Sequence, residues 1–223
     1  EVAGQWLEGR RERVILATKC FGRMGQPKWD GGNSRKHILD AVEGSLRRLG
    51  TDYIDLYQLH QYDPETPIDE TLRALEDVVR SGKVRYVGCS NFLAYQVARS
   101  LGRSEAMGVV RMDSVQPRYN LLFREIEREL LPLAAEAGVG VIPYNPIAGG
   151  MLTGKHKRDT GPTEGTRFTL GNAASNYQDR YWHDRQFDTV EQLLPIAAEA
   201  GMPLATLATA WVLANPAVTA PII

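Results

Sequence analysis

Short apolar runs rich in β-branched residues alternate along the chain with longer stretches in which apolar residues recur every three or four positions. The first pattern is typical of buried strands and the second of amphipathic helices. Because strands that alternate with helices form parallel sheets, the order predicts an α/β protein. The expected strands are residues 14–18, 53–59, 84–88, 112–116, 139–143 and 218–222.

Several expected helices carry residues that mark their ends. Ser34 is a suitable N-cap for a helix that Gly50 ends. Thr66 resembles the first residue of a capping box, with Pro67 at the first helical position and Asp69 three residues on. Further helices are expected over residues 1–9 and 125–138, then one ending near residue 201 and one beginning near residue 203. The turn-rich residues 149–184 exceed a routine connection of about 2–6 residues, so we expect them to have a function.

Six strand–helix units fit either an open doubly wound sheet or an incomplete (β/α)8 TIM barrel, which normally needs about 250 residues. The chain starts within an expected helix and stops on an expected strand, whereas chain ends are usually polar and frayed. We therefore expect residues 1–223 to be a single domain that holds the third to the eighth barrel strands, without the first two strands and the C-terminal tail. Alone, such a piece is expected to be inactive, because its barrel cannot close.

Acidic and basic residues nearly cancel in the 223-residue chain, leaving a net charge of −1. No overall field therefore attracts nucleic acid or anionic lipid, and no apolar run approaches the ~20 residues that span a bilayer. Cys20 and Cys89 lie far apart and outside any CxxC pair, a usage typical of a reducing compartment. These features favour a cytoplasmic protein that acts on a small molecule, and they leave its oligomeric state open.

Polar side chains stand where the expected strands end. The carboxyl ends of parallel barrel strands open onto one face, which collects the reactive groups. A lysine, a histidine, an aromatic ring and several amide or hydroxyl groups suit a polar substrate and a flat cofactor ring. The positions are Lys19, His60, Ser90, Asn91, Gln116, Tyr144 and Asn145.

Five stretches resemble, in order and spacing, the strand-end motifs of the aldo-keto reductase superfamily, and within it the bacterial sugar-aldehyde reductases and potassium-channel β subunits. The resemblance implies reduction of an aldehyde or ketone carbonyl by direct hydride transfer from NADPH. The carbonyl compounds that it implies include sugar-like ones. The stretches are ATK at 17–19, DLYQLH at 55–60, GCSNF at 88–92, Gln116 with YNLL at 119–122, and YNPI at 144–147.

The resemblance implies catalytic roles for two residues. Lys19 matches a lysine whose ammonium lowers the pKa of a proton-donating tyrosine. His60 matches a histidine that orients the carbonyl and hydrogen-bonds to its developing negative charge. The family's tyrosine, and the aspartate that pairs with the lysine, are expected upstream of Glu1. Three tyrosines of this chain lie within the second expected strand or past its end and are not expected to replace it: Tyr53, Tyr57 and Tyr62.

The resemblance also implies the cofactor contacts. Ser90, Asn91 and Gln116 are expected on the nicotinamide carboxamide, and Tyr144 is expected to stack on the ring. The loop after Tyr144 is expected to follow the pyrophosphate, with two cations farther along. The expected preference for NADPH over NADH rests on the resemblance alone. The remaining cofactor-binding residues that it implies are Asn145, Pro146, Ile147, Gly149, Lys155 and Arg167.

Other interpretations of single motifs are weaker. The G-x-x-x-x-G-K pattern of 149–155 imitates a P-loop, but His156 stands where a magnesium-binding Ser or Thr is needed, and turn residues follow instead of a helix. His37, His156 and His183 lack metal-ligand spacing, so we expect no metal site and place them at the surface. The two cysteines are expected to be buried structural thiols.

Two rival functions come from other classes. A non-catalytic NADPH-binding regulatory or sensor subunit would have less need of Lys19 and His60 together. A barrel lyase or isomerase acting on phosphorylated substrates would need carboxylate bases at the strand ends, and the sequence has none there.

Overall fold

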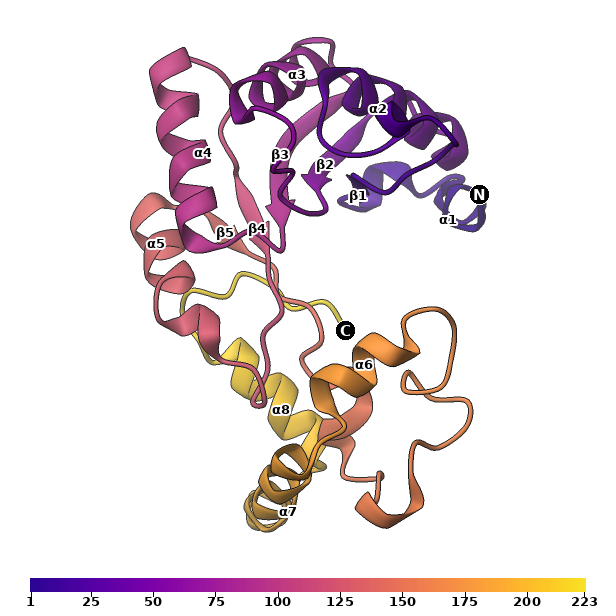
Figure 1. Cartoon of the computed structure of the whole chain (residues 1–223), viewed down its shortest axis with the longest axis vertical. Helices are drawn as coiled ribbons and strands as arrows, with labels where there is room; N and C mark the ends of the chain where they lie inside the picture. Colours follow the sequence, from indigo (N-terminus) through magenta and orange to yellow (C-terminus); the bar gives the residue numbers. More distant parts are fainter. The chain divides into compact units, whose positions relative to one another are not determined.

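The computed structural model describes residues 1–223 and has an α/β fold with a five-stranded parallel sheet in the order β1-β2-β3-β4-β5 (Figure 1). Contacts between Cα atoms divide the chain into two compact units. Unit 1 comprises Glu1–Gln116 and Pro132–Gly140, and unit 2 comprises Pro117–Leu131 and Val141–Ile223. The strands are β1 (Ala17–Cys20), β2 (Ile54–Leu59), β3 (Val84–Ser90), β4 (Ser114–Gln116) and β5 (Gly140–Val141).

Helices pack along the sheet in unit 1. Helix α2 contacts β1 and α3, and α3 contacts both β3 and α4 (Figure 1). The buried residues of α2 and α3 recur at helical spacing, as expected of helices that cover a sheet with one face. The helices that begin before residue 132 are α1 (Val2–Leu7), α2 (Arg35–Leu49), α3 (Ile68–Arg80), α4 (Ala94–Met107) and α5 (Leu130–Ala137).

Five of the six expected strands are confirmed, with ends shifted by up to three residues. The sixth, residues 218–222, is wrong as a strand, because it makes only isolated bridges from Val218 to Val141 and from Ile222 to Tyr144. The N–H of Val141 donates to the side-chain hydroxyl of Thr219 at 3.1 Å, where a ladder would use a main-chain carbonyl. Pro221 has no N–H to donate. These two residues interrupt the ladder.

The expected helix ends are confirmed at α2 and wrong in part at α3. The Ser34 side chain accepts a hydrogen bond from the N–H of His37, and Gly50 ends α2 in the left-handed conformation. Helix α3 begins at Ile68 without a side-chain cap. The hydroxyl of Thr66 instead donates to Asp63 at 2.7 Å, so a nearby carboxylate competes successfully for the proposed capping residue.

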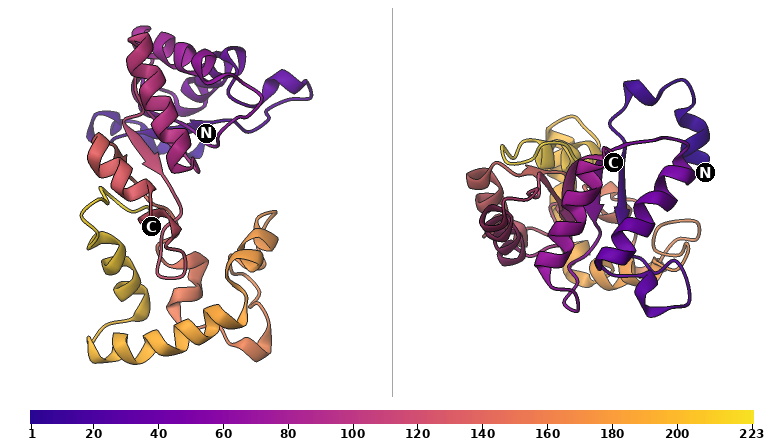
Figure 2. Two further views of the ribbon diagram at one scale, coloured as in Figure 1. Left: turned by 60° about the vertical axis from the view of Figure 1, so that its left-hand side comes forward. Right: turned by 90° about the horizontal axis from the view of Figure 1, so that it is seen from above.

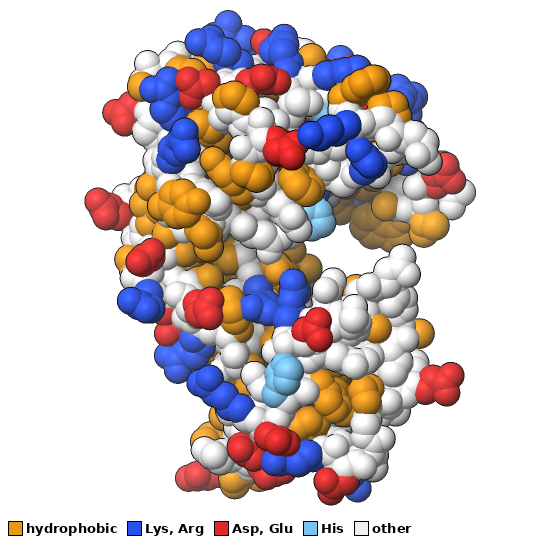
Figure 3. All heavy atoms as spheres, in the orientation of Figure 1, with side chains coloured by type: hydrophobic (Ala, Val, Ile, Leu, Met, Phe, Trp, Pro, Cys, Tyr) orange, Lys and Arg blue, Asp and Glu red, His pale blue; other side chains and the backbone are white.

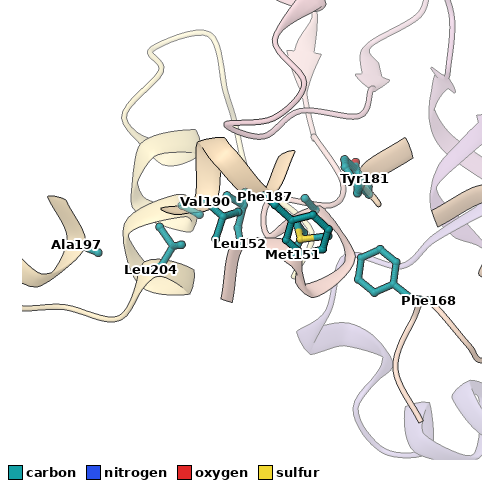
Figure 4. Packing of buried hydrophobic residues seen from close by; sticks show 10 residues of the cluster. Met151, Leu152, Phe168, Tyr181, Phe187, Val190, Ala197 and Leu204 are labelled. Atoms are coloured by element: carbon teal, nitrogen blue, oxygen red, sulfur yellow. The ribbon is translucent and has the colours of Figure 1, made fainter. Parts of the chain in front are cut away.

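The long stretch 149–184 contributes to the core of unit 2. It contains α6 (Ala174–Tyr181) and short 3-10 turns at Ala148–Thr153 and Arg158–Thr160, and α7 (Asp184–Glu199) and α8 (Leu204–Leu213) follow. Side chains from the stretch pack with those of α7 and α8 (Figure 4). The cluster includes Met151, Leu152, Phe168, Tyr181, Phe187, Val190 and Leu204.

Two histidines expected at the surface are buried, so that expectation is wrong for His37 and His156. The His156 side chain is 6% exposed, and neither ring nitrogen has a hydrogen-bond partner. Its ring meets Phe168 and Trp182 edge-on at centroid distances of 5.0 and 5.3 Å. Burial, followed by the nearby charge of Lys155, lowers the pKa of His156. The residues next to His156 in the sequence are polar, so the sequence pattern did not predict its contact with these aromatic rings.

The helices of unit 1 carry basic side chains interspersed with acidic ones (Figure 3). Arg103 of α4, for example, donates to both carboxylate oxygens of Asp69 in α3, at 2.8 and 2.6 Å. Exposed pairs of this kind contribute only about 0–1 kcal/mol each, so the buried apolar faces stabilise this helix layer more than its charges do.

No single helix combines the length and the apolar character needed to cross a membrane. Helices α7 and α8 reach the required length and composition when taken together, but the chain bends by 89° between them (Figure 2).

Replacing Gly88 with alanine is expected to destabilise the protein. A Cβ at this position in β3 would lie 2.4 Å from the Ser114 hydroxyl oxygen and 2.9 Å from the Ser114 carbonyl oxygen, so β3 and β4 would have to separate. Forcing a methyl group into a packed region costs roughly 1–3 kcal/mol. Urea unfolding should show a lower midpoint for Gly88→Ala.

The matched control is Gly102→Ala in α4, where an added Cβ meets nothing within 4 Å. Alanine at an exposed helix position should raise the free energy of unfolding by up to about 1 kcal/mol. Equal midpoints for the two variants would contradict the close approach of β3 to β4.

Candidate functional site

The strand ends of unit 1 bring five of the expected site residues to one edge of the sheet. Strands β1 to β4 are parallel, so their carboxyl ends lie side by side. Lys19 is the next-to-last residue of β1, and His60 follows β2 directly. Ser90 ends β3, Asn91 follows it, and Gln116 ends β4. The expectation that these strand ends share one edge is confirmed within unit 1.

Hydrogen bonds join the ends of all four strands, β1 to β4. The Ser90 hydroxyl donates to the main-chain carbonyl of Gln116 at 2.8 Å. The amide of Asn91 donates to the main-chain carbonyl of His60 at 3.0 Å and to the Ser90 hydroxyl at 3.2 Å. The His60 N–H in turn donates to the Cys20 carbonyl at 2.9 Å. The turn after each strand is therefore fixed by its neighbour.

Asn91 adopts a backbone conformation that favours few residue types. Its φ is +57°, in the left-handed region, which asparagine tolerates better than most other non-glycine residues. That conformation accompanies the hydrogen bond from its amide to the residue that follows β2.

The charge of Lys19 acts on His60. Burial lowers the pKa of the half-buried Lys19 ammonium. Burial, and then the positive charge of Lys19, lower the pKa of His60. A lowered pKa keeps the imidazole neutral at pH 7, and a neutral imidazole can donate one N–H to a carbonyl oxygen. The pair can thus place a cation and a neutral hydrogen-bond donor near one reacting group.

The tyrosines near His60 are poorly suited to donate a proton there. Tyr57 is fully buried, its hydroxyl donates to the carbonyl of Ile38 at 3.5 Å, and burial raises its pKa. Tyr53 precedes β2, so it lies toward the opposite end of that strand from His60. Tyr62 packs edge-on against Phe92 at 5.4 Å.

The other expected site residues lie in unit 2, beginning at a turn after β5. The N–H of Tyr144 donates to the Pro117 carbonyl at 2.9 Å, and the N–H of Tyr119 donates to the Tyr144 carbonyl at 3.3 Å. Asn145 has a φ of +61°. Its side-chain nitrogen is buried without a hydrogen-bond partner. The turn is therefore fixed in its main chain and keeps an amide donor available.

Gly149 is required at its position for two reasons. Its φ is +68°, which glycine adopts without steric cost. A Cβ would also lie 2.5 Å from the ring of Tyr177, so only glycine lets the loop pass this close to α6. The loop from Asn145 to Gly150 therefore has a defined path against α6.

A cavity of about 810 Å³ lies in unit 2. This volume is within the roughly 300–1,000 Å³ of small-molecule and cofactor sites. Lys155 is exposed and does not line the cavity. Six of the seven expected cofactor residues of unit 2 do line it: Tyr144, Asn145, Pro146, Ile147, Gly149 and Arg167.

The sequence interpretation missed three polar residues at these places. Gln58 is fully buried, and its side-chain oxygen accepts from the Gln116 amide at 3.3 Å. A glutamine inside an apolar strand was a signal that could have identified it. Thr206 and Thr209 of α8 line the cavity three residues apart on one helix face. Nothing in their surrounding apolar sequence marks them.

Each unit separately has polar groups of a kind that a nicotinamide dinucleotide needs. The buried amide nitrogen of Asn145 without a partner can donate to a ligand oxygen, and Arg167 brings a positive charge to the same cavity. In unit 1, Ser90, Asn91 and Gln116 lie close enough together to contact one carboxamide.

The sequence comparisons define the family. The model of the aldo/keto reductase family matches residues 1–223. The chain is 40% identical to an uncharacterized oxidoreductase, YrpG, of Bacillus subtilis, with 100% of this chain and 67% of the relative covered. It is 41% identical to an aldo-keto reductase of Fusarium vanettenii, with 96% and 62% covered. The chain therefore belongs to the aldo/keto reductase family, a family of oxidoreductases that generally use NAD(P)H.

A further relative carries a different description. The chain is 39% identical to a rice (Oryza sativa subsp. japonica) protein named "Probable voltage-gated potassium channel subunit beta", with 98% of this chain and 67% of that protein covered. The chain thus spans about two thirds of the length of these curated relatives.

Proposed function

We propose that this protein is a cytoplasmic NADPH-dependent reductase of aldehyde or ketone carbonyls, sugar-like ones included. The observation that carries the proposal is the pairing of Lys19 and His60 at adjacent strand ends, where the lysine's charge lowers the pKa of the histidine. Membership of the aldo/keto reductase family supports the same chemistry.

Lys19 and His60 act on the reacting carbonyl. Neutral His60 donates an N–H to the carbonyl oxygen and stabilises the negative charge that develops there. The Lys19 ammonium favours the ionised form of an adjacent acid and so makes its proton easier to transfer. Asn91 holds the main chain of His60 in place through its amide.

The remaining residues bind and orient the cofactor. When bound, the reduced nicotinamide supplies the hydride that adds to the carbonyl carbon. Ser90, Asn91 and Gln116 hold its carboxamide, and Tyr144 stacks on the ring. The turn at Asn145, with Pro146, Ile147 and Gly149, follows the pyrophosphate. Lys155 and Arg167 supply positive charge, and Arg167 has the stronger support because it lines the cavity.

The proposal includes a (β/α)8 barrel as a single domain, which the five parallel strands and the family membership support. The sparse use of cysteine, two residues outside any CxxC pair, supports the cytoplasmic location, because that usage is typical of reducing compartments. The partner of the site is a small-molecule carbonyl compound.

A non-catalytic NADPH-binding sensor subunit is the second candidate. The relative named as a potassium channel subunit beta favours it. In that case the same residues bind the dinucleotide, and occupancy of the site rather than turnover is the signal. Channel association in this protein would follow from that role.

Steady-state reduction of a panel of aldehydes and ketones by the full-length protein, followed by nicotinamide absorbance, separates the two candidates. Turnover with NADPH, and less with NADH, is expected for the reductase. Tight NADPH binding with no turnover of any carbonyl would favour the sensor. Binding of neither dinucleotide would refute both.

A further inference from the structure

Asn120 is fully buried in unit 2, and every polar group of its side chain has a partner. Its amide nitrogen donates to the main-chain carbonyl of Asn145 at 2.9 Å and to the hydroxyl of Tyr181 at 3.1 Å. Its side-chain oxygen accepts from the N–H of Leu122 at 3.0 Å. One side chain therefore joins the loop after β4, the turn after β5 and helix α6.

The turn that Asn120 contacts is the wall of the cavity. Asn145 lines the cavity between Tyr144 and Pro146, and its φ of +61° lies in the left-handed region, where even asparagine is less stable than in the right-handed or extended regions. A hydrogen bond to the Asn145 carbonyl opposes relaxation of that turn. Asn120 itself is not among the residues that line the cavity.

Helix α6 forms a second hydrogen bond to the same turn. The Tyr177 hydroxyl donates to the side-chain oxygen of Asn145 at 3.2 Å. The Tyr181 hydroxyl accepts from Asn120. With its oxygen engaged by Tyr177, the Asn145 amide is oriented so that its nitrogen is the group left without a partner. The network therefore fixes the orientation of the Asn145 amide.

We propose that Asn120 is a positioning residue for cofactor binding: it fixes the Tyr144–Pro146 turn, through the Asn145 carbonyl, in the conformation that binds the dinucleotide. The inference rests on the proposed function of this cavity. Asn120 acts indirectly: it contacts the turn and α6, and the residues that line the cavity contact the ligand. Its effect therefore appears in dinucleotide affinity and leaves the chemistry of Lys19 and His60 unchanged.

The test compares dinucleotide affinity with turnover in the full-length protein. Asn120→Asp keeps the size of the side chain and an acceptor for Leu122, and in its ionised form it removes the donor to Asn145, whereas Asn120→Ala removes that donor at any pH. We expect the NADPH Kd of Asn120→Asp, and of Asn120→Ala, to rise about tenfold or more. A tenfold change corresponds to about 1.4 kcal/mol, comparable to one buried hydrogen bond. The kcat at saturating NADPH should stay within about threefold of wild type, since an interaction made equally in ground and transition states changes affinity only.

Asn215→Ala is the matched control. Asn215 also lies in unit 2, where its amide donates to the Tyr119 hydroxyl at 3.1 Å and accepts from the N–H of Ala217 at 3.0 Å. Its side chain forms no hydrogen bond with Asn145 or α6. This variant should lower the melting temperature as Asn120→Ala does, and it should bind NADPH as wild type does. Tyr181→Phe, which keeps the ring and removes the hydroxyl, is the second variant should Asn120→Ala fail to fold, and it should raise Kd by a smaller factor.

The outcomes are distinct. Unchanged NADPH affinity in both Asn120→Asp and Asn120→Ala would overturn the inference alone. An equal loss of affinity in Asn215→Ala would also overturn it, because affinity would then follow stability. A wild-type protein that binds no dinucleotide would overturn the proposed function and, with it, this role of Asn120.

Discussion

Replacing Lys19 with methionine in the full-length protein is expected to lower kcat/KM for carbonyl reduction by about 10²–10⁴-fold, the usual contribution of a positioned group that assists proton transfer. Methionine keeps most of the length of the lysine side chain and removes the ammonium. Without that charge, an adjacent acid loses the neighbour that favours its ionised form. The Lys19→Met variant should still bind NADPH, because the expected dinucleotide contacts are made by other residues.

Lys83→Met is the control for this variant. Lys83 lies in the same unit just before β3, at the opposite end of the strands from Lys19, and forms an ion pair with Glu43. Its loss should leave kcat/KM within about twofold and change stability by less than about 1 kcal/mol. Wild-type turnover in Lys19→Met, measured in the same assay, would refute the role given to Lys19.

The His60 imidazole provides a further readout of the same pair. With the charge of Lys19 removed, the second influence that lowers the pKa of His60 disappears and burial alone is left. The His60 pKa should therefore rise in Lys19→Met, and NMR titration of the ring protons measures it directly. This shift is independent of substrate, so it tests the proximity of the two side chains even where turnover is lost.

The sequence predicted the strand ends of unit 1 well, and the reason is physical. Buried parallel strands are short apolar runs, so the point where each run meets a polar residue is visible without coordinates. Lys19, His60, Ser90 and Gln116 were found in this way, and parallel pairing then brings them to one edge. Their roles in catalysis stay predictions.

The errors came where a side chain from elsewhere in the chain decides the outcome. Asp63 takes the hydroxyl of Thr66 and so removes the expected helix cap. Thr219 takes the N–H of Val141 and so interrupts the last expected strand. His156 enters an aromatic cluster although its sequence neighbours are polar. Each of these contacts depends on tertiary packing, which overrides local pattern.

The site shows the same division. The resemblance to a known family indicated the residues expected to contact the cofactor. Six of the seven that lie in unit 2 line one cavity. The residues that hold them in place carry weaker signals. Asn120 lies within the YNLL motif of residues 119–122, but its hydrogen bond to Asn145 spans 25 positions of the sequence and is visible only in the coordinates. The role of a supporting residue depends on its contacts in three dimensions, and a single sequence does not reveal contacts between distant positions.

The two cysteines are expected to resist thiol reagents in the folded protein. Burial raises the pKa of Cys20 from 9.0 to about 11 and raises that of Cys89 as well. Because the thiolate is the reactive form, a rise of about two pKa units lowers its fraction at pH 8 about 100-fold. Both side chains are also shielded from a bulky reagent, since neither is more than 5% exposed. Labelling with a disulfide reagent should therefore be at least about 100-fold slower in buffer than in urea.

The sheet also keeps the two thiols from joining. Cys20 and Cys89 both pair in register with Leu59, one on each side of β2. Two strand spacings separate their Cα atoms by about 9–10 Å, beyond the ~7 Å limit for a disulfide. A mild oxidant should therefore leave both thiols free in the native protein, as mass spectrometry after alkylation in urea would show. The Cys20→Ser and Cys89→Ser variants assign any labelling to one thiol. Rapid modification of either cysteine in the native state would contradict their burial and would identify a redox-sensitive thiol beside Lys19 or Ser90.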